Sequence, residues 1–152
     1  KALKEKGVEF HLNLAGKEET EGEYIPRFTK TFGDNFTYHG IVSGDKKNDI
    51  LKKCDIFLLP SFYEGLPISL LETMSFGQVP VVTAVGSIPT IVKEHKNGIF
   101  IDIKDTESIV KAIYKLTTDK ALYSALSIKA KETILEKFDD KEYIKLLNKL
   151  YN

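Results

Sequence analysis

The chain has 152 residues, a length typical of one compact domain with a sizeable buried core. Its 22 lysines and arginines balance its 22 aspartates and glutamates, so the formal net charge of zero provides no general attraction to nucleic acids or membrane surfaces. We therefore expect no nucleic-acid partner, and an anionic ligand would have to be held by local groups.

The cysteine content and the hydropathy pattern bear on location. Cys54 has no second cysteine with which to form an internal disulfide, and this fits a reducing compartment. No apolar run approaches the roughly 18 residues of a membrane-spanning helix, and KALKEKGVEF lacks the apolar region of a signal peptide. We expect a cytoplasmic protein.

The first part of the chain alternates between helix and strand. Residues Lys1 to Lys6, closed by Gly7, are typical of the end of a helix, and the chain starts without methionine, so we expect a piece of a longer protein. The segment VEFHLNLAG predicts a short strand. A helix is expected from about Glu23 to Phe32 with Pro26 in its first turn, and FTYHG predicts a second strand.

The rest of the chain continues this alternation. After a helix in SGDKKNDILKKCD, the segment IFLLP has no polar alternation, as expected for a strand buried on both faces of a parallel sheet. Helix ISLLETMSFG, strand VPVVTA, short helix SIPTIVKEH and strand GIFI follow, and then helical segments, the first capped by Asp105 and the last over residues 141–152. This order predicts a single α/β domain over residues 1–152: a doubly wound, Rossmann-like parallel sheet with helices on both faces and appended C-terminal helices.

Four loops after the predicted strands are rich in glycine, serine and proline. They are AGKEET, HGIVSGD, PSFYEGLP and TAVGSIP. In a doubly wound sheet the ligand crevice lies outside the carboxyl ends of the strands, where these loops would meet. Each loop taken singly is typical of an ordinary turn, because glycine accommodates positive φ as readily as close approach of a ligand.

The third loop carries two glutamates, Glu64 and Glu72, eight positions apart. Pro67 disfavours helix for the residue before it, so the helix is expected to begin at Pro67 or Ile68, with Glu64 in the loop and Glu72 inside the helix. The first turn, up to Leu70, would offer unpaired backbone N–H groups and the positive end of the helix dipole. That is an anion site suited to a phosphate.

Three interpretations of the two glutamates follow from the residues. A glycoside hydrolase needs two carboxyls about 5 to 10 Å apart across a sugar, and one of them needs a raised pKa. A helix N-terminus would instead lower the pKa of a nearby carboxyl. Early carboxylates can also simply complement the helix dipole, which is the commoner arrangement in an arbitrary α/β sequence. In the third interpretation, Glu72 accepts hydrogen bonds from ribose hydroxyls, a diphosphate lies at the helix start, and Glu64 lies near a sugar.

The stretch DIFLLPSFYEGLPISLLETMSFGQVPVVTAVGSIPTIVKEHKNGIFID resembles the C-terminal half of retaining GT-B glycosyltransferases of family four, also called glycosyl transferase group 1. The most specific element is the Glu-x7-Glu motif, Glu64 to Glu72, within its flanks. The likeness extends from the LAG loop to the helices after GIFID. The resemblance implies a domain that binds a nucleotide-diphosphate sugar donor for retaining transfer of the sugar to an acceptor.

Carried onto matching positions, the resemblance implies a role for each residue around the motif. Glu64 is the expected catalytic residue, in contact with the donor sugar, and Glu72 would hold the ribose. The residues expected to form the turn beside the donor are Gly65, Leu66, Pro67 and Ile68.

The remaining expected donor-binding residues come from three places. Ser69 and Leu70 would present backbone N–H groups to the diphosphate. Gly16 would line the phosphate side of the pocket, and Ile41 and Val42 would contact the base. No metal and no other cofactor is expected.

The resemblance also implies parts outside the chain. The family has an arginine and a lysine that balance the charge of the diphosphate, and both would precede Lys1. The N-terminal domain that recognises the acceptor would also precede Lys1, so this domain of the same full-length protein is an expected partner. We expect the isolated chain to be inactive as a transferase. Membrane association is expected only through the missing half.

Two other functions stay open at this point. A nucleotide-sugar epimerase of the GT-B kind would bind the same donor without an acceptor, and a non-catalytic module would bind the nucleotide sugar alone. The histidines, His11, His39 and His95, show no metal-ligand spacing, although His39 is nearest the expected crevice. Ser61 and Ser69 lack the G-x-S-x-G motif of a serine hydrolase.

Overall fold

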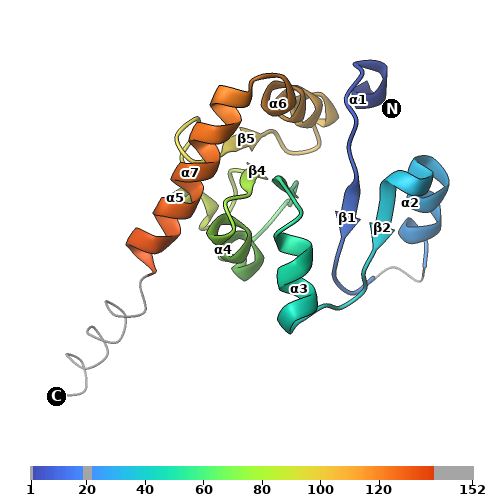
Figure 1. Cartoon of the computed structure of the whole chain (residues 1–152), viewed down its shortest axis with the longest axis horizontal. Coiled ribbons are helices and arrows are strands. Elements are labelled where there is room, and N and C mark those ends of the chain that lie inside the picture. The colour runs from blue at the N-terminus through green and yellow to red at the C-terminus, as the bar shows by residue number, and fades with distance from the viewer. Residues whose placement is uncertain (1, 19–21, 139–152) are drawn as a thin grey trace. The chain divides into compact units, whose positions relative to one another are not determined.

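The computed structural model describes residues 2–18 and 22–138, which belong to two compact units, Lys1–Cys54 and Asp55–Asn152. All strand pairs within the described ranges are parallel, and they form two sheets, one in each unit (Figure 1). The predicted α/β class with parallel strands is thus confirmed. The single domain over residues 1–152 stays a prediction, and the last predicted helix, over 141–152, lies outside the described residues.

The first unit is built on a two-stranded sheet. Its elements in chain order are α1 (Ala2–Glu5), β1 (Leu12–Leu14), α2 (Tyr24–Phe32), the 3-10 helix η1 (Gly33–Asn35), β2 (Phe36–Tyr38) and α3 (Gly44–Leu51). β1 and β2 run parallel with Leu12 opposite Phe36. α2, the helix predicted from about Glu23 to Phe32, connects them. Parallel neighbours require such a crossover, because a tight hairpin can join only antiparallel strands.

Phenylalanine rings form the contact between α2 and this sheet. The ring of Phe28 lies 5.6 Å from that of Phe36, and the ring of Phe32 lies 5.9 Å from that of Phe10, measured between centroids. Both pairs meet edge to face, which is the favoured geometry for aromatic side chains. The opposite face of β1 therefore carries the alternating polar residues, among them His11 and Asn13.

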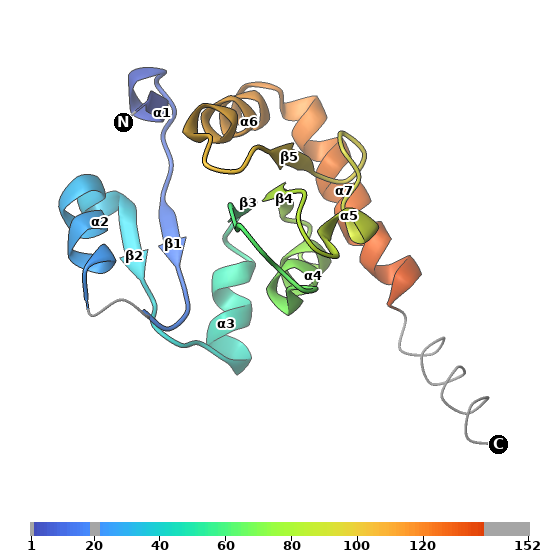
Figure 2. The ribbon, with the colours of Figure 1, turned by 180° about the vertical axis from the view of Figure 1, so that it is seen from behind.

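The second unit is built on a three-stranded sheet in the order β3-β4-β5 (Figure 2). Its elements are β3 (Ile56–Leu59), α4 (Ile68–Ser75), β4 (Val79–Thr83), α5 (Ile88–Ile91), β5 (Ile99–Ile101), α6 (Thr106–Thr118) and α7 (Lys120–Lys137). α4 begins at Ile68, directly after Pro67, as predicted. Asp105 caps α6 as predicted, because its carboxylate accepts a hydrogen bond from the amide of Glu107 at 2.8 Å.

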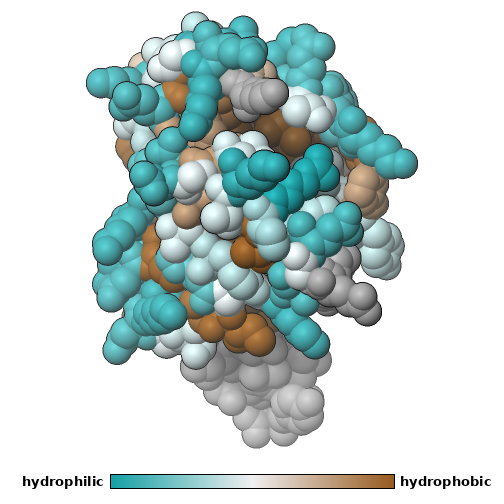
Figure 3. All heavy atoms as spheres, turned by 90° about the vertical axis from the view of Figure 1, so that its right-hand side faces the viewer, coloured by the Kyte–Doolittle hydropathy of each residue, from teal (hydrophilic) through white to brown (hydrophobic). Residues whose placement is uncertain are grey.

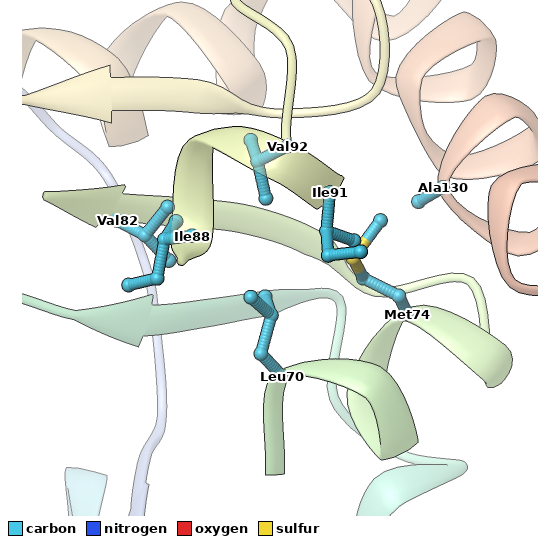
Figure 4. Packing of buried hydrophobic residues seen from close by; sticks show 7 residues of the cluster. All are labelled: Leu70, Met74, Val82, Ile88, Ile91, Val92 and Ala130. Atoms are coloured by element: carbon cyan, nitrogen blue, oxygen red, sulfur yellow. The ribbon is translucent and has the colours of Figure 1, made fainter. Parts of the chain in front are cut away.

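Two apolar clusters cover the two faces of β4. Neighbouring residues of a strand point to opposite faces, so Val81 and Val82 belong to different clusters. The side chains that pack with Val82 come from α4, α5, α7 and the residue after α5, and Figure 4 shows them to be Leu70, Met74, Ile88, Ile91, Val92 and Ala130. On the other face, Val81 packs with side chains of β5, α6 and α7. The predicted helices on both faces of the sheet are confirmed.

The most buried strand differs from the one that the sequence indicates. The expected strand buried on both faces was IFLLP, but every residue of β3 is only half-buried. Every residue of β4 is buried. The expectation holds in part for β3: Phe57 and Leu59 pack against one cluster and Ile56 and Leu58 against the other, but only β4, which has two strand neighbours, is buried completely.

Hydrophilic side chains predominate on the face drawn in Figure 3, where hydrophobic side chains form several separate patches. Across residues 2–18 and 22–138, the structure contains no helix with the length and apolar character needed to span a bilayer.

Candidate functional site

Glu64 lies in the loop between β3 and α4, where its carboxylate is held by a neighbour. The hydroxyl of Ser61 donates a hydrogen bond to Glu64 Oε1 at 2.7 Å, and both residues are half-buried. The carbonyl of Ser61 in turn accepts a hydrogen bond from the hydroxyl of Thr83 at 2.7 Å. Thr83 is the last residue of β4 and is fully buried. Two successive hydrogen bonds therefore connect the Glu64 carboxylate to the end of the central strand.

The loop after β4 also touches the backbone of Glu64. Gly86 has φ of +55°, and a Cβ atom placed on it would overlap the carbonyl oxygen of Glu64 and lie 2.8 Å from its carbonyl carbon. The amide of Ser87 donates to the carbonyl of Gly65 at 3.1 Å. Only glycine fits at position 86, because a side chain there would be both strained and blocked.

The loop after β5 reaches the same region. Lys104 places its ammonium 5.4 Å from the centre of the Phe62 ring, a cation–π distance. Phe62 and Tyr63 are exposed, as is Ile68 at the start of α4. The loops that follow the three strands of the second unit therefore meet around the segment that carries Glu64.

The start of α4 presents backbone amides without a competing carboxylate. Pro67 is its N-cap residue, and its first turn contains no acidic side chain. The amide of Leu70 donates to the carbonyl of Pro67 at 3.0 Å, and the Leu70 side chain is fully buried. Because that amide already has an acceptor, the amides of Ile68 and Ser69 are better placed to bind an anion than that of Leu70.

Glu72 lies in the second turn of α4, so Glu64 precedes the start of this helix in the sequence and Glu72 follows it. It is half-buried, and its carbonyl accepts a hydrogen bond from the Ser75 hydroxyl at 2.6 Å. The helix start thus stands between a carboxylate in the loop and a carboxylate within the helix. This order can flank an anionic group with two acceptors for hydroxyl groups.

The expected residues of the first unit gather at the ends of β1 and β2. The amide of Gly16 donates to the carbonyl of Gly40 at 2.8 Å, and the Tyr38 hydroxyl donates to the carbonyl of Gly16 at 2.9 Å. Ile41 follows Gly40 and is exposed, and Val42 is half-buried. Gly16 is therefore held beside Gly40, the residue before Ile41, by one backbone hydrogen bond, and a second hydrogen bond comes from the Tyr38 side chain.

His39 lies on the polar face of the same sheet and binds Asn13. His39 Nε2 is 2.9 Å from Asn13 Oδ1. Burial lowers the pKa of His39 below its ordinary value, and the charge of Lys46 and the neighbouring His11 lower this pKa further. These residues belong to an open cavity of about 700 Å³, lined by His11, Asn13, His39, Lys46, Asp49, Ile50 and Lys53.

That cavity contains none of the residues expected to bind a donor. Its lining is mainly charged or polar, and it lies on the face of β1 and β2 opposite the phenylalanine cluster. Throughout residues 2–18 and 22–138, no group of three or more His, Cys, Asp or Glu side chains is arranged to hold a metal ion. The absence of a metal requirement stays a prediction.

Four residues around Glu64 were not among the predicted site residues. They are Ser61, Thr83, Gly86 and Ser87. The sequence places TAVGSIP at the ligand edge of the sheet, but the contact of Gly86 with Glu64 joins residues from two different loops. Nothing in the local pattern of either loop indicates which backbone atoms meet.

Comparison with known proteins defines the class of this chain. Residues 1–133 match the family described as glycosyl transferases group 1. The chain belongs to this family.

Characterised relatives are similar over most of the chain. One is the UDP-Gal:alpha-D-GlcNAc-diphosphoundecaprenol alpha-1,3-galactosyltransferase of Escherichia coli, 31% identical over 103 residues that cover 68% of this chain and 26% of the relative. Another is the N-acetyl-alpha-D-glucosaminyl L-malate synthase of Bacillus anthracis, 26% identical over 70% of this chain and 28% of the relative. The chain spans about a quarter of the length of these relatives.

Solved structures show the same fold. Anabaena Alr3699/HepE, solved in complex with UDP-glucose, superposes with a TM-score of 0.76 at 14% identity, covering 91% of this chain and 41% of that one. The C-terminal domain of a glycosyl transferase group 1 family protein from Francisella tularensis superposes with a TM-score of 0.68 at 16% identity, covering 91% of this chain and 92% of that domain. The Rossmann-like fold expected from the order of strands and helices is confirmed.

Proposed function

We propose that this chain is the donor-binding domain of a retaining glycosyltransferase that uses a nucleotide-diphosphate sugar. The observation that carries the proposal is the position of Glu64 and Glu72 on either side of the start of α4, in a chain that belongs to the glycosyl transferase group 1 family. The names of its relatives support it: the Escherichia coli protein is a galactosyltransferase named for UDP-Gal, and Alr3699/HepE was solved with UDP-glucose.

Each part of the donor has a proposed site. The diphosphate lies at the start of α4, where the amides of Ile68 and Ser69 and the helix dipole attract negative charge. Glu72 accepts hydrogen bonds from the two ribose hydroxyls, and Glu64 contacts the transferred sugar. A carboxylate suits both tasks because it only accepts hydrogen bonds and can serve two hydroxyls at once.

Three residues of the first unit are also proposed to contact the donor. Gly16 contributes to the phosphate side, and Ile41 and Val42 contact the base. The hydrogen bonds of Gly16 with Gly40 and Tyr38 hold these segments together and support this assignment. Gly65, Leu66 and Pro67 form the turn that brings the chain from Glu64 to the helix start.

Catalysis in this proposal is positional and electrostatic. The amides at the start of α4 stabilise the departing diphosphate, while Glu64 orients the sugar for attack by the acceptor. These amides provide the positive potential that the leaving group needs, so we propose that no metal ion or other cofactor takes part. The acceptor is recognised by an N-terminal domain of the same full-length protein.

Calorimetry of Glu72→Ala tests the ribose assignment. Titration of the chain with UDP, GDP and ADP in buffer containing EDTA identifies the nucleotide that binds. Loss of hydrogen bonds to a charged acceptor should weaken that binding by about 10- to 100-fold. Glu107→Ala is the matched control, because Glu107 is a helix-borne glutamate whose exposed side chain pairs only with Lys111 among the ion pairs that the structure describes.

Unchanged nucleotide affinity in Glu72→Ala would refute the ribose assignment, and binding that is lost in EDTA would refute the metal-free proposal. Neither alternative function is favoured by the comparisons, since the relatives named above are a transferase and a synthase. Product analysis of the full-length protein with and without acceptor separates transfer from epimerisation.

A further inference from the structure

The position of Glu64 depends on the loop after β4 through contacts of two kinds. The first is the hydrogen-bonded series from Thr83 to the Ser61 carbonyl and from the Ser61 hydroxyl to the Glu64 carboxylate, with both distances 2.7 Å. The second is backbone contact: Gly86 lies against the carbonyl group of Glu64, and the amide of Ser87 binds the carbonyl of Gly65.

Thr83 is the origin of the first series. It ends the central strand of the sheet and is fully buried, so its hydroxyl cannot reach a ligand in solution. β4 pairs with β3 in register up to the pair formed by Leu59 and Val82. The hydrogen bond from the Thr83 hydroxyl to the Ser61 carbonyl therefore joins β4 to the chain that follows β3, one residue beyond the last paired position of β4.

Gly86 supplies the second contact. Its φ of +55° and the lack of space for a Cβ atom leave the backbones of the two loops in direct contact. Any side chain at position 86 must push the carbonyl of Glu64 away. Because that carbonyl is part of the residue whose carboxylate acts on the sugar, the displacement moves the reactive group itself.

We propose that Thr83 and Gly86 are positioning residues for Glu64: through Ser61 and the Glu64 backbone, the loop after β4 sets where the carboxylate stands relative to the sugar. This inference rests on the proposed function of Glu64. It predicts that turnover and nucleotide affinity separate, because the contacts of Thr83 and Gly86 that carry the inference reach Ser61 and Glu64, whereas the proposed function places the nucleotide at Glu72 and the start of α4.

The test uses the full-length protein and measures its hydrolysis of a nucleotide sugar in the absence of an acceptor. The probe is whichever of UDP-glucose, GDP-glucose and ADP-glucose the unaltered protein hydrolyses fastest. Gly86→Ala is expected to lower kcat by on the order of 100-fold, since a displacement of about 1 Å can cost that much. Thr83→Val keeps the side-chain shape and removes the hydroxyl, and it is expected to lower kcat about 10-fold.

Two controls accompany these variants. Thr83→Ser keeps the hydroxyl and is expected to restore kcat to within about twofold of the unaltered protein. Gly33→Ala matches the φ of Gly86, since both are +55°, but a Cβ atom at Gly33 would meet nothing within 4 Å. Gly33 precedes β2, so it lies at the end of that strand opposite the Ile41 loop. Its substitution is expected to leave hydrolysis unchanged.

The dissociation constant of the nucleotide product provides the second readout. It is expected to change by less than about threefold in Thr83→Val and Gly86→Ala. A loss of affinity equal to the loss of turnover would overturn the positioning role, because the whole site would then be disturbed. If Gly86→Ala fails to fold, the comparison of Thr83→Val with Thr83→Ser decides the question.

Glu64→Gln separates this inference from the proposal on which it rests. A Glu64→Gln protein with unaltered turnover would overturn the proposed role of Glu64 itself. A slow Glu64→Gln protein beside fully active Thr83→Val and Gly86→Ala proteins would overturn the positioning role alone.

Discussion

His39 is a residue whose neutral form the fold favours. Burial lowers its pKa first, and the positive charge of Lys46 and the neighbouring His11 lower it further, while its ring binds Asn13 at 2.9 Å. A histidine with a lowered pKa in the folded state binds fewer protons there than in the unfolded chain. The free energy of unfolding must therefore rise with pH wherever the unfolded chain binds more protons at this histidine, and it must fall as the solution is acidified.

The resulting prediction concerns acid stability. The free energy of unfolding should decrease as the pH falls through about 6.5, where the histidine of an unfolded chain takes up its proton. His39→Gln removes this titration and retains a group that can bind Asn13, so its stability should depend less on pH over that interval. Urea denaturation at a series of pH values measures both slopes, and equal slopes in the two proteins would contradict the assignment.

Individual site residues could be predicted from sequence to different extents. Glu64 and Glu72 stand out because a proline separates them into loop and helix, and the start of α4 at Ile68 is where this proline places it. The sequence alone offers Ser61 only as a candidate nucleophile without the G-x-S-x-G motif. Its observed role as a donor to Glu64 depends on the bend at Phe62 and Tyr63 between them, which the motif does not specify.

At the level of elements, α7 is joined to the sheet by a few fully buried side chains. Leu126 is 1% exposed and packs in the cluster with Val81, whereas Ile128, two residues further along the helix, is 58% exposed. Both are large aliphatic residues of one helix. They differ mainly in the direction in which the helix presents them.

This pair provides a matched test of packing in the second unit. Leu126→Ala should reduce the free energy of unfolding by about 2–5 kcal/mol, because it removes buried surface and leaves a cavity. Ile128→Ala should cost less than about 1 kcal/mol, since its side chain is already mostly in water. Urea denaturation followed by far-ultraviolet circular dichroism compares the two, and equal losses would contradict the assigned packing of α7.

Element order was the most predictable feature of the fold. Apolar runs separated by glycine and proline indicated each strand, and Asp105 and Pro67 indicated where two of the helices begin. The burial of β3 was not predictable in the same way. An apolar strand in the centre of a sheet and one at its edge have the same local pattern, and only the pairing order distinguishes them.

For the whole protein, the proposed function makes the isolated chain an incomplete enzyme. The chain spans about a quarter of the relatives that it matches, and its proposed site binds the donor without an acceptor. The isolated chain should therefore bind the nucleotide, but it should release sugar more slowly than the full-length protein does. Hydrolysis of the same nucleotide sugar by both proteins measures this, and equal rates would refute the division of labour between two domains.

Local signals along the chain were enough to predict the α/β class, the alternation of elements and the Glu-x7-Glu motif, because each depends on a few consecutive residues. Family membership then gave these residues a chemical context. The contacts that hold Glu64 were beyond such signals. Thr83 meets Ser61 across 22 positions, and Gly86 meets Glu64 across the same distance in sequence, because β3 and β4 pair in parallel and bring their carboxyl ends to one edge. The strand pairing thus decides how the Glu64 carboxylate is held, although the motif that contains it is visible in the sequence.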